Sequence, residues 1–209
     1  MRRRAPWIVL FLLPIGVIAL DDYAAFLRPY LPWATSRPGG AASPRPACAW
    51  AQPLAAPHLE NFFRVGPGLY RGAQPDAEGM RALKAMGIRT VVNLRYMHSD
   101  RHLLAGTGLA YREIDVNPFK PTAEQLVEFL RVVQDPNCTP VFVHCHRGID
   151  RTGMMCAVYR MVVCGWPKDE AIAEMQHGPF GYDAIFRNVP EFLWTLDVQA
   201  LGRRVAARP

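Results

Sequence analysis

The residues whose types and spacing could do chemistry centre on one cysteine, Cys145, and one arginine, Arg151, which lies six positions further along the chain. A thiolate is a strong nucleophile, and a guanidinium presents a planar fork of donors that holds two oxygens of one phosphate group. In-line attack of the thiolate on a phosphate monoester held in this way gives a phosphocysteine and expels the alcohol. We therefore predict a phosphatase with Cys145 as the nucleophile and Arg151 as the anion clamp.

The stretch from Cys145 to Arg151 is predicted to form a phosphate loop (residues 145–151) that surrounds the anion with backbone N–H groups. The intervening residues are expected to contact the phosphate: His146, Arg147, Gly148, Ile149 and Asp150. The loop lies between an apolar strand, 141–144, and a helix that starts at about Arg151 or Thr152, so the helix N-terminus adds partial positive charge. The same field favours the thiolate form of the cysteine.

Single side chains in this stretch have expected roles of their own. Gly148 allows the backbone to bend tightly without a Cβ clash. His146 and Arg147 are expected either to add positive charge at the pocket mouth or to be simple exposed loop residues. Thr152 is expected to hydrogen-bond the sulfur and ease departure of the thiolate in the second step. His144 is expected to orient the loop, since a thiol that is already ionised needs no base.

Residues 144–153 resemble the Cys-x5-Arg signature of the protein tyrosine and dual-specificity phosphatase superfamily, in the form His-Cys-x-x-Gly-x-x-Arg-Thr-Gly. The segments Leu69–Pro75 and Gly87–Arg95 look like the start of compact bacterial and plant-type dual-specificity domains. The resemblance covers roughly residues 60–200. It implies hydrolysis of phosphotyrosine, phosphoserine and phosphothreonine in proteins.

The leaving oxygen needs a proton donor, and the resemblance implies an Asp on a loop about thirty residues before the cysteine. Asp115 fits this position, because it is expected to follow a strand and to precede the loop 117–119. Asp150, inside the phosphate loop, is the alternative acid, as in myotubularin-like relatives with an Asp just before the arginine. Its other expected role is structural, through hydrogen bonds to loop amides or to Arg147.

Alternating strand and helix patterns must position these residues. Short apolar runs predict strands at 62–65, 69–71, 90–94, 109–114 and 141–144. Capping residues and helical periodicity predict helices at 76–86, from Thr122 to before Pro136, and at 152–164, 167–175 and 190–205. This alternation predicts the α/β class, with a central, mostly parallel sheet flanked by helices and the phosphate loop between a strand and a helix.

The beginning of the chain reads as a targeting or anchoring element over residues 1–34. Arg2–Arg4 precede an uncharged, mostly apolar run, Trp7–Leu20. This run is short for a membrane span and suits a signal-peptide core or an uncleaved anchor. We expect an exported or membrane-anchored protein of a bacterial inner membrane or periplasm, with the cytoplasmic face as the alternative. Residues 35–57 have linker composition, and the catalytic domain is expected over 58–209.

Composition narrows the class further. The 209 residues are 50% hydrophobic and 20% charged, which is globular rather than disordered composition. The formal net charge of +6 favours anionic partners. We expect a phosphorylated protein, a phospholipid or an inositol phosphate as substrate, a membrane as partner through the N-terminal segment, and no nucleic acid. The five cysteines include no C-x-x-C pair, so no zinc, other metal or cofactor is expected.

Other functions stay open from the sequence. A short segment between strand and nucleophile predicts a shallow pocket, which also admits inositol phosphates and phosphoinositides. A second alternative is an inactive phosphate-binding module. A third is a sulfur-transfer or arsenate-reducing enzyme, in which Cys138 or Cys156 would serve as the resolving thiol.

Overall fold

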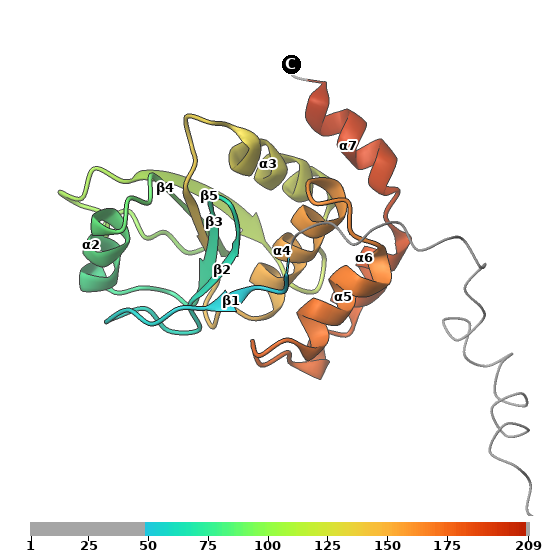
Figure 1. The fold of residues 1–209 in the computed structure, drawn as a ribbon, viewed down its shortest axis with the longest axis horizontal. Helices are drawn as coiled ribbons and strands as arrows, with labels where there is room; N and C mark the ends of the chain where they lie inside the picture. Colours follow the sequence, from blue (N-terminus) through green and yellow to red (C-terminus); the bar gives the residue numbers. More distant parts are fainter. Residues whose placement is uncertain (1–48, 208–209) are drawn as a thin grey trace, which may run out of the picture. The chain divides into compact units, whose positions relative to one another are not determined.

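A single sheet with the strand order β1–β2–β3–β6–β4–β5 lies at the centre of the fold (Figure 1). The computed structural model describes residues 49–207. The strands are β1 Gln52–Pro53, β2 Phe63–Gly66, β3 Leu69–Gly72, β4 Thr90–Arg95, β5 Ala110–Val116 and β6 Val141–His144. β1, β2 and β3 pair antiparallel, whereas β3, β6, β4 and β5 run parallel. The predicted mostly parallel α/β sheet is confirmed.

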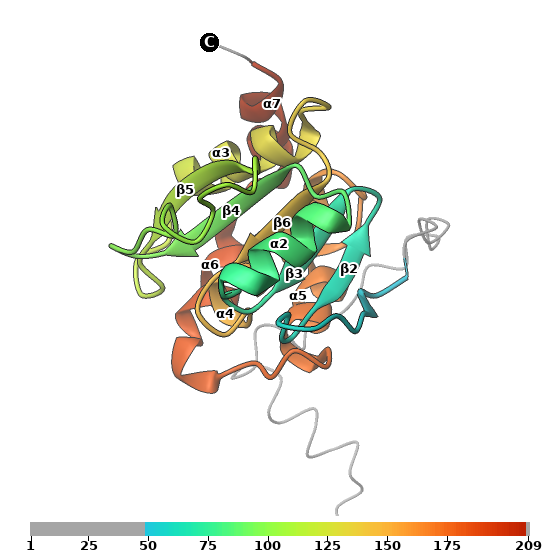
Figure 2. The same cartoon turned by 90° about the vertical axis from the view of Figure 1, so that its left-hand side faces the viewer.

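Helices cover both faces of this sheet. They are α2 Ala77–Ala85, α3 Ala123–Gln134, α4 Asp150–Val162, α5 Lys168–His177, the 3₁₀ helix η3 Ala184–Phe186, α6 Asn188–Thr195 and α7 Val198–Ala206. Helix α2 lies against one face, and α3 to α7 form the layer on the other (Figure 2).

Neighbouring residues in the central strands alternate between two apolar clusters. Val91 and Phe142 pack in the cluster on the α2 side, whereas Val92 and Val143 pack with the helices of the opposite layer. Successive side chains of a strand point to opposite faces, so a strand covered on both faces must be apolar throughout. This burial explains why the sequence of β4 and β6 reads as nearly continuous apolar runs.

Strands β3 and β6 end at the same level, beside Cys145, and β4 continues only two residues further. Gly72 of β3 and Asn93 of β4 are both register partners of His144, the last residue of β6. In open α/β sheets, ligands bind outside the carboxyl ends of the strands. The topology therefore delivers Cys145, the next residue, to the edge where a ligand site is expected.

The predicted bounds of the last helix and of the linker are wrong. The expected helix 190–205 is two helices, α6 and α7, because Asp197 begins a new one by accepting a hydrogen bond from the N–H of Ala200 at 2.9 Å. The expected linker also ends earlier than residue 57. Ala51 is buried, and its N–H donates to Oε1 of Glu174 at 2.6 Å. The folded part therefore includes strand β1.

The predictions for residues 1–34, and with them the signal, membrane and location predictions, lie outside the described residues and stay predictions. Between residues 49 and 207, no helix is long and apolar enough to cross a bilayer.

Candidate active site

Cys145 lies where strand β6 ends and the phosphate loop begins, and its thiol is free and buried. Helix α4 begins five residues later, at Asp150, and Ile149 at its N-cap supplies no side-chain hydrogen bond. The first N–H groups of a helix have no partner within the helix, and they carry its partial positive charge. Left uncapped, those of α4 are available to an anion next to the thiol.

Arg151 and Thr152 follow in the first turn of α4. Arg151 is partly buried, and within residues 49–207 its guanidinium pairs with no carboxylate, so it is available to a ligand. Thr152 is fully buried, and its hydroxyl finds no hydrogen-bond partner in the part of the chain that the structure describes. The expected bond from Thr152 to the sulfur is therefore not formed in this structure. His146 is an exposed loop residue.

Gly148 gives the phosphate loop its tight bend. Its φ is +70°, a conformation that residues with a Cβ rarely adopt. A Cβ at this position would also lie 2.3 Å from the carbonyl oxygen of Gly72, at the end of β3. The loop is thus packed directly against the backbone of the neighbouring strand, and only glycine fits between them.

Arg71, in strand β3, hydrogen-bonds the carbonyl groups of the phosphate loop. Its side chain is almost fully buried, and Nη2 donates to the carbonyl oxygens of Gly148 at 2.7 Å and of Ile149 at 3.4 Å. Its guanidinium lies 3.8 Å from the centre of the Phe180 ring. Since the C=O and N–H of a trans peptide point in opposite directions, bonding these carbonyls turns the loop amides toward the ligand side.

Asn61 also hydrogen-bonds the phosphate loop, and the sequence did not indicate it. Its side-chain amide donates to the carbonyl oxygens of Arg147 at 3.0 Å, Gly148 at 3.4 Å and Phe180 at 3.1 Å. Asn61 therefore joins the phosphate loop to the α5–α6 connection (residues 178–187). It follows no recognisable motif, and its partners lie 86 or more positions away, so nothing in the sequence pointed to it.

His144 belongs to a buried network next to Cys145. Its Nδ1 lies 3.1 Å from the carbonyl oxygen of Cys145, and its Nε2 lies 3.1 Å from Oδ2 of Asp100. Nε2 of His98 lies 3.1 Å from the other oxygen of the same carboxylate. Burial opposes ionisation of Asp100, but hydrogen bonding and charge from His144, followed by Gln74 and His98, outweigh it and lower the pKa of Asp100. The orienting role of His144 stays a prediction, and the structure places Asp100 beside it as a partner.

Arg147 and Asp150 face each other at the outer side of the phosphate loop, together with Asp183 of the α5–α6 connection. Nη2 of Arg147 lies 2.8 Å from a carboxylate oxygen of Asp183 and 3.8 Å from one of Asp150. Burial raises the pKa of Asp150, whereas the hydrogen bond from Arg147 lowers the pKa of Asp183. The positive charge expected from Arg147 is therefore neutralised by a residue that the sequence did not indicate.

Asp115 lies within strand β5, not after a strand as expected, because β5 continues to Val116. Its exposed carboxylate accepts a hydrogen bond from the N–H of Met97 at 3.1 Å. Strand β5 is two positions from β6 in the sheet, so Asp115 is displaced sideways from the nucleophile strand by about 10 Å. The loop that follows is tied to helix α6, since Asn188 donates to the carbonyl oxygen of Pro118 at 2.8 Å.

A thiol at the end of a central parallel strand is followed by a tightly bent loop and by an arginine that has no carboxylate partner among residues 49–207. Together these features define a cysteine-dependent phosphatase. Among residues 49–207, no group of three or more His, Cys, Asp or Glu side chains could hold a metal ion. A sequence model described as "PTP-NADK: DSP-PTPase phosphatase fused to NAD+ Kinase" matches residues 65–183. The chain belongs to this family of cysteine-dependent dual-specificity phosphatases.

Similar proteins include bacterial and plant phosphatases. Dual specificity protein phosphatase TpbA of Pseudomonas aeruginosa is 34% identical over 159 residues, which is 76% of this chain and 72% of that protein. Inositol diphosphatase DSP2 of Oryza sativa is 27% identical over 125 residues, or 56% of this chain and 61% of that protein. The crystal structure of a cysteine-to-serine variant of TpbA in complex with pTyr superposes with a TM-score of 0.68 at 31% identity. That superposition covers 80% of this chain and all of the other.

Proposed function

We propose that this enzyme hydrolyses phosphate monoesters of phosphorylated proteins, phosphotyrosine foremost, with Cys145 as nucleophile and Arg151 as phosphate clamp. The observation that carries the proposal is the junction of β6 and α4. It combines a buried free thiol, an uncapped helix N-terminus and an arginine without a carboxylate partner among the described residues. The likeness to TpbA, whose variant was crystallised with pTyr, supports phosphotyrosine as the substrate.

The proposed reaction has two displacements at phosphorus. In the first, the sulfur of Cys145 bonds to phosphorus while the bond to the leaving oxygen breaks, and Asp115 gives that oxygen a proton. In the second, water attacks phosphorus, the S–P bond breaks, and Asp115 takes the proton of the water. Arg151 and the loop amides hold the equatorial oxygens in both steps. Thr152 serves the departing sulfur, since its buried hydroxyl is not engaged by another described residue.

Asp150 is less suited to be the acid, although burial raises its pKa and so favours the protonated form. One of its oxygens accepts the N–H of Asp183 at 3.2 Å, and the other faces Arg147 at the rim. Both oxygens are thus directed to the outer side of the loop. We assign Asp150 to loop structure and Asp115 to proton transfer.

Substitution tests these roles. Cys145→Ser and Arg151→Ala should each reduce turnover of an aryl phosphate by at least about 10³-fold, with inorganic phosphate still bound by the serine variant. Cys138→Ser, a cysteine outside the loop, is the matched control and should keep normal turnover. In the same series, Asp115→Asn should slow phosphoserine peptides by about 10²-fold and good aryl leaving groups far less. Normal rates in the Cys145 variant would refute covalent catalysis and favour a binding module.

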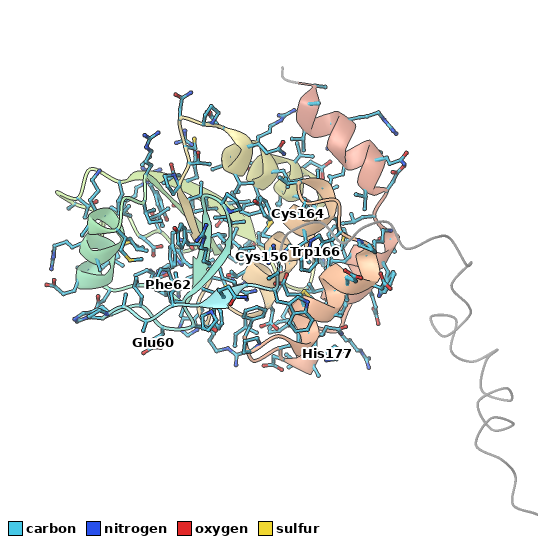
Figure 3. All side chains as sticks on the ribbon, viewed as in Figure 1. Glu60, Phe62, Cys156, Cys164, Trp166 and His177 are labelled. Carbon is cyan, nitrogen blue, oxygen red and sulfur yellow. The ribbon has the colours of Figure 1, made fainter. Side chains whose placement is uncertain are left out.

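Inositol phosphates are the second candidate substrate, because relatives such as DSP2 are named inositol diphosphatases. The arsenate-reducing alternative with Cys156 as the resolving thiol is disfavoured. Cys156 lies inside the layer between the sheet and the helices (Figure 3), and burial raises its pKa to about 11. A resolving thiol must ionise and reach the nucleophile, and a fully buried, protonated thiol does neither readily.

A further inference from the structure

The guanidinium of Arg147 is held between two carboxylates at the rim of the site. Its Nη2 lies 2.8 Å from Oδ2 of Asp183 and 3.8 Å from Oδ2 of Asp150. The side chain of Arg147 is 52% exposed and that of Asp183 is 37% exposed, whereas Asp150 is buried. Arg147 and Asp183 are therefore open to solvent beside the phosphate loop, where they can meet further charged groups of a bound substrate.

The backbone around Asp183 is fixed against the phosphate loop, so the ion pair does not depend on a mobile side chain finding its partner. The N–H of Asp183 donates to Oδ1 of Asp150 at 3.2 Å. Three residues earlier, the carbonyl oxygen of Phe180 accepts from Asn61, which also bonds the carbonyl of Arg147. Asp183 in addition caps η3, since its Oδ1 accepts the N–H of Ile185 at 3.2 Å. Such preorganisation lowers the entropic cost of holding the pair.

The side chains of Arg147, Asp183 and Asp150 carry a net charge of zero when Asp150 is protonated and of −1 when it is ionised. Burial raises the pKa of Asp150, while Arg147 keeps Asp183 ionised by lowering its pKa. A substrate with one phosphate needs only the loop amides and Arg151. A polyphosphorylated ring brings further anionic groups to the rim, and there it meets a neutral or negative cluster in place of a free cation.

The same connection also contributes apolar surface beside this cluster. Ile185 is 66% exposed, and the ring of Phe186 lies 5.3 Å from that of Phe119, which is itself 61% exposed. Aromatic and aliphatic side chains suit the ring of an aryl phosphate and offer nothing to a second anion.

We propose that Asp183 is a specificity-determining residue, which neutralises Arg147 and so makes the enzyme select singly phosphorylated side chains, phosphotyrosine foremost, over polyphosphorylated inositols. This inference rests on the proposed function and assigns its substrate class. It gives Arg147 a role opposite to the one expected from its charge alone.

The test measures turnover of a phosphotyrosine peptide by the full chain and its inhibition by inositol hexakisphosphate. In Asp183→Asn the isosteric amide can still cap η3, but the charge of Arg147 is no longer cancelled. We expect the inhibition constant of the hexakisphosphate to fall by about tenfold, while kcat/KM for the peptide changes less than about twofold. Added salt should shrink the difference, because exposed charges are screened.

Two controls define the outcome. The double variant Arg147→Ala/Asp183→Asn should not be inhibited more strongly by the hexakisphosphate than the wild type. The same holds for Asp169→Asn, which removes an exposed carboxylate in the first turn of α5. An unchanged inhibition constant in Asp183→Asn, or a wild type that prefers polyphosphorylated inositol to the peptide, overturns the inference while Cys145-dependent turnover remains. Failure of the proposed function itself would appear earlier, as a wild type without Cys145-dependent turnover of the peptide.

Discussion

Three arginines around the phosphate loop carry the same charge in three different environments. Arg71 is buried and bonds loop carbonyls, Arg147 is ion-paired with Asp183, and Arg151 has no carboxylate partner among the residues the structure describes. Only the last is available to an anion. The role of each arginine therefore depends on the group that its guanidinium already contacts. The residue type alone does not reveal that contact.

Asp100 offers a prediction at the same scale. Its folded-state pKa lies below the ordinary value of 3.8, so its ionised form stabilises the fold above that pH. The contribution is lost as the pH falls through the folded-state pKa. We expect Asp100→Asn to melt about 5 °C below the wild type at neutral pH, and this gap to narrow as the pH falls below about 4.

Thermal denaturation at several pH values between neutrality and about pH 2 measures both effects. Asp169→Asn, whose carboxylate is exposed, should melt like the wild type throughout. A gap that stays constant with pH would contradict an ionised Asp100 beside His144, and would leave side-chain packing as the cause of any destabilisation.

The residues proposed as nucleophile and clamp could be brought together from the sequence because they are local. Cys145, Gly148 and Arg151 lie within seven consecutive residues, so one strand–loop–helix unit places them whatever the rest of the chain does. Asn61 and Asp183 were not predictable, since they lie 86 and 36 positions from Arg147 and meet it only through the tertiary fold. The role of Asp115 as the acid stays a prediction, and its expected place after the strand was wrong, because β5 runs two residues further than predicted, to Val116.

Elements with strong local signals were predicted closely. Thr122 and Gln125 form the reciprocal capping box that begins α3, as the N-cap residue indicated. Strand β6 has the predicted bounds. The strand order β3–β6–β4–β5 was not predictable, because parallel pairing is decided by packing between segments distant in sequence. The break between α6 and α7 was missed because the apolar pattern continues across it, although the backbone of Leu196 is extended and Asp197 caps a new helix.

The phosphate loop supplies a prediction at the scale of elements. In Gly148→Ala the new Cβ would meet backbone atoms of Gly72 and Ala73, which have no rotamer to change, and φ would remain positive. The loop must then move away from β3 and from Arg71. We expect activity to fall by at least about 10²-fold and the free energy of unfolding to drop by about 2–4 kcal/mol.

Gly87→Ala is the matched control. Gly87 also has a positive φ, of +85°, but a Cβ there would meet nothing within 4 Å. This variant isolates the cost of the backbone conformation, about 1 kcal/mol, and should leave turnover intact. Equal losses in both variants, measured by denaturant unfolding and aryl phosphate turnover, would mean that the contact between the loop and β3 has no effect of its own.

For the molecule as a whole, a buried ion pair joins the beginning of the folded part to two helices. Arg160 of α4 and Glu174 of α5 are both buried and make two hydrogen bonds, at 2.8 and 2.9 Å. Glu174 also accepts the N–H of Ala51, and Arg160 donates to the carbonyl oxygen of Ala49 at 3.1 Å. The guanidinium lies 4.4 Å from the centre of the Trp166 ring. The segment before β2 is thus fastened to the helical layer by charged groups.

This arrangement predicts a large effect from a small change. Glu174→Gln keeps the shape of the side chain but leaves Arg160 buried without its counter-charge, which should lower the free energy of unfolding by about 3 kcal/mol. The hydrogen bond to Ala51 should weaken as well. We therefore expect limited proteolysis to cut the segment 49–53 faster in the variant, while Cys145-dependent turnover measured well below the melting temperature stays normal.

Glu78→Gln tests whether the effect comes from burial. Glu78 and Arg81 form an ion pair of the same type on the surface of α2, where both side chains are more than half exposed. Water already solvates each charge there, so the variant should melt like the wild type. Similar melting temperatures for both variants would show that the pair of Arg160 and Glu174 is as dispensable as a surface pair. In that case the apolar contacts of Ala51 and its neighbours alone would hold the segment.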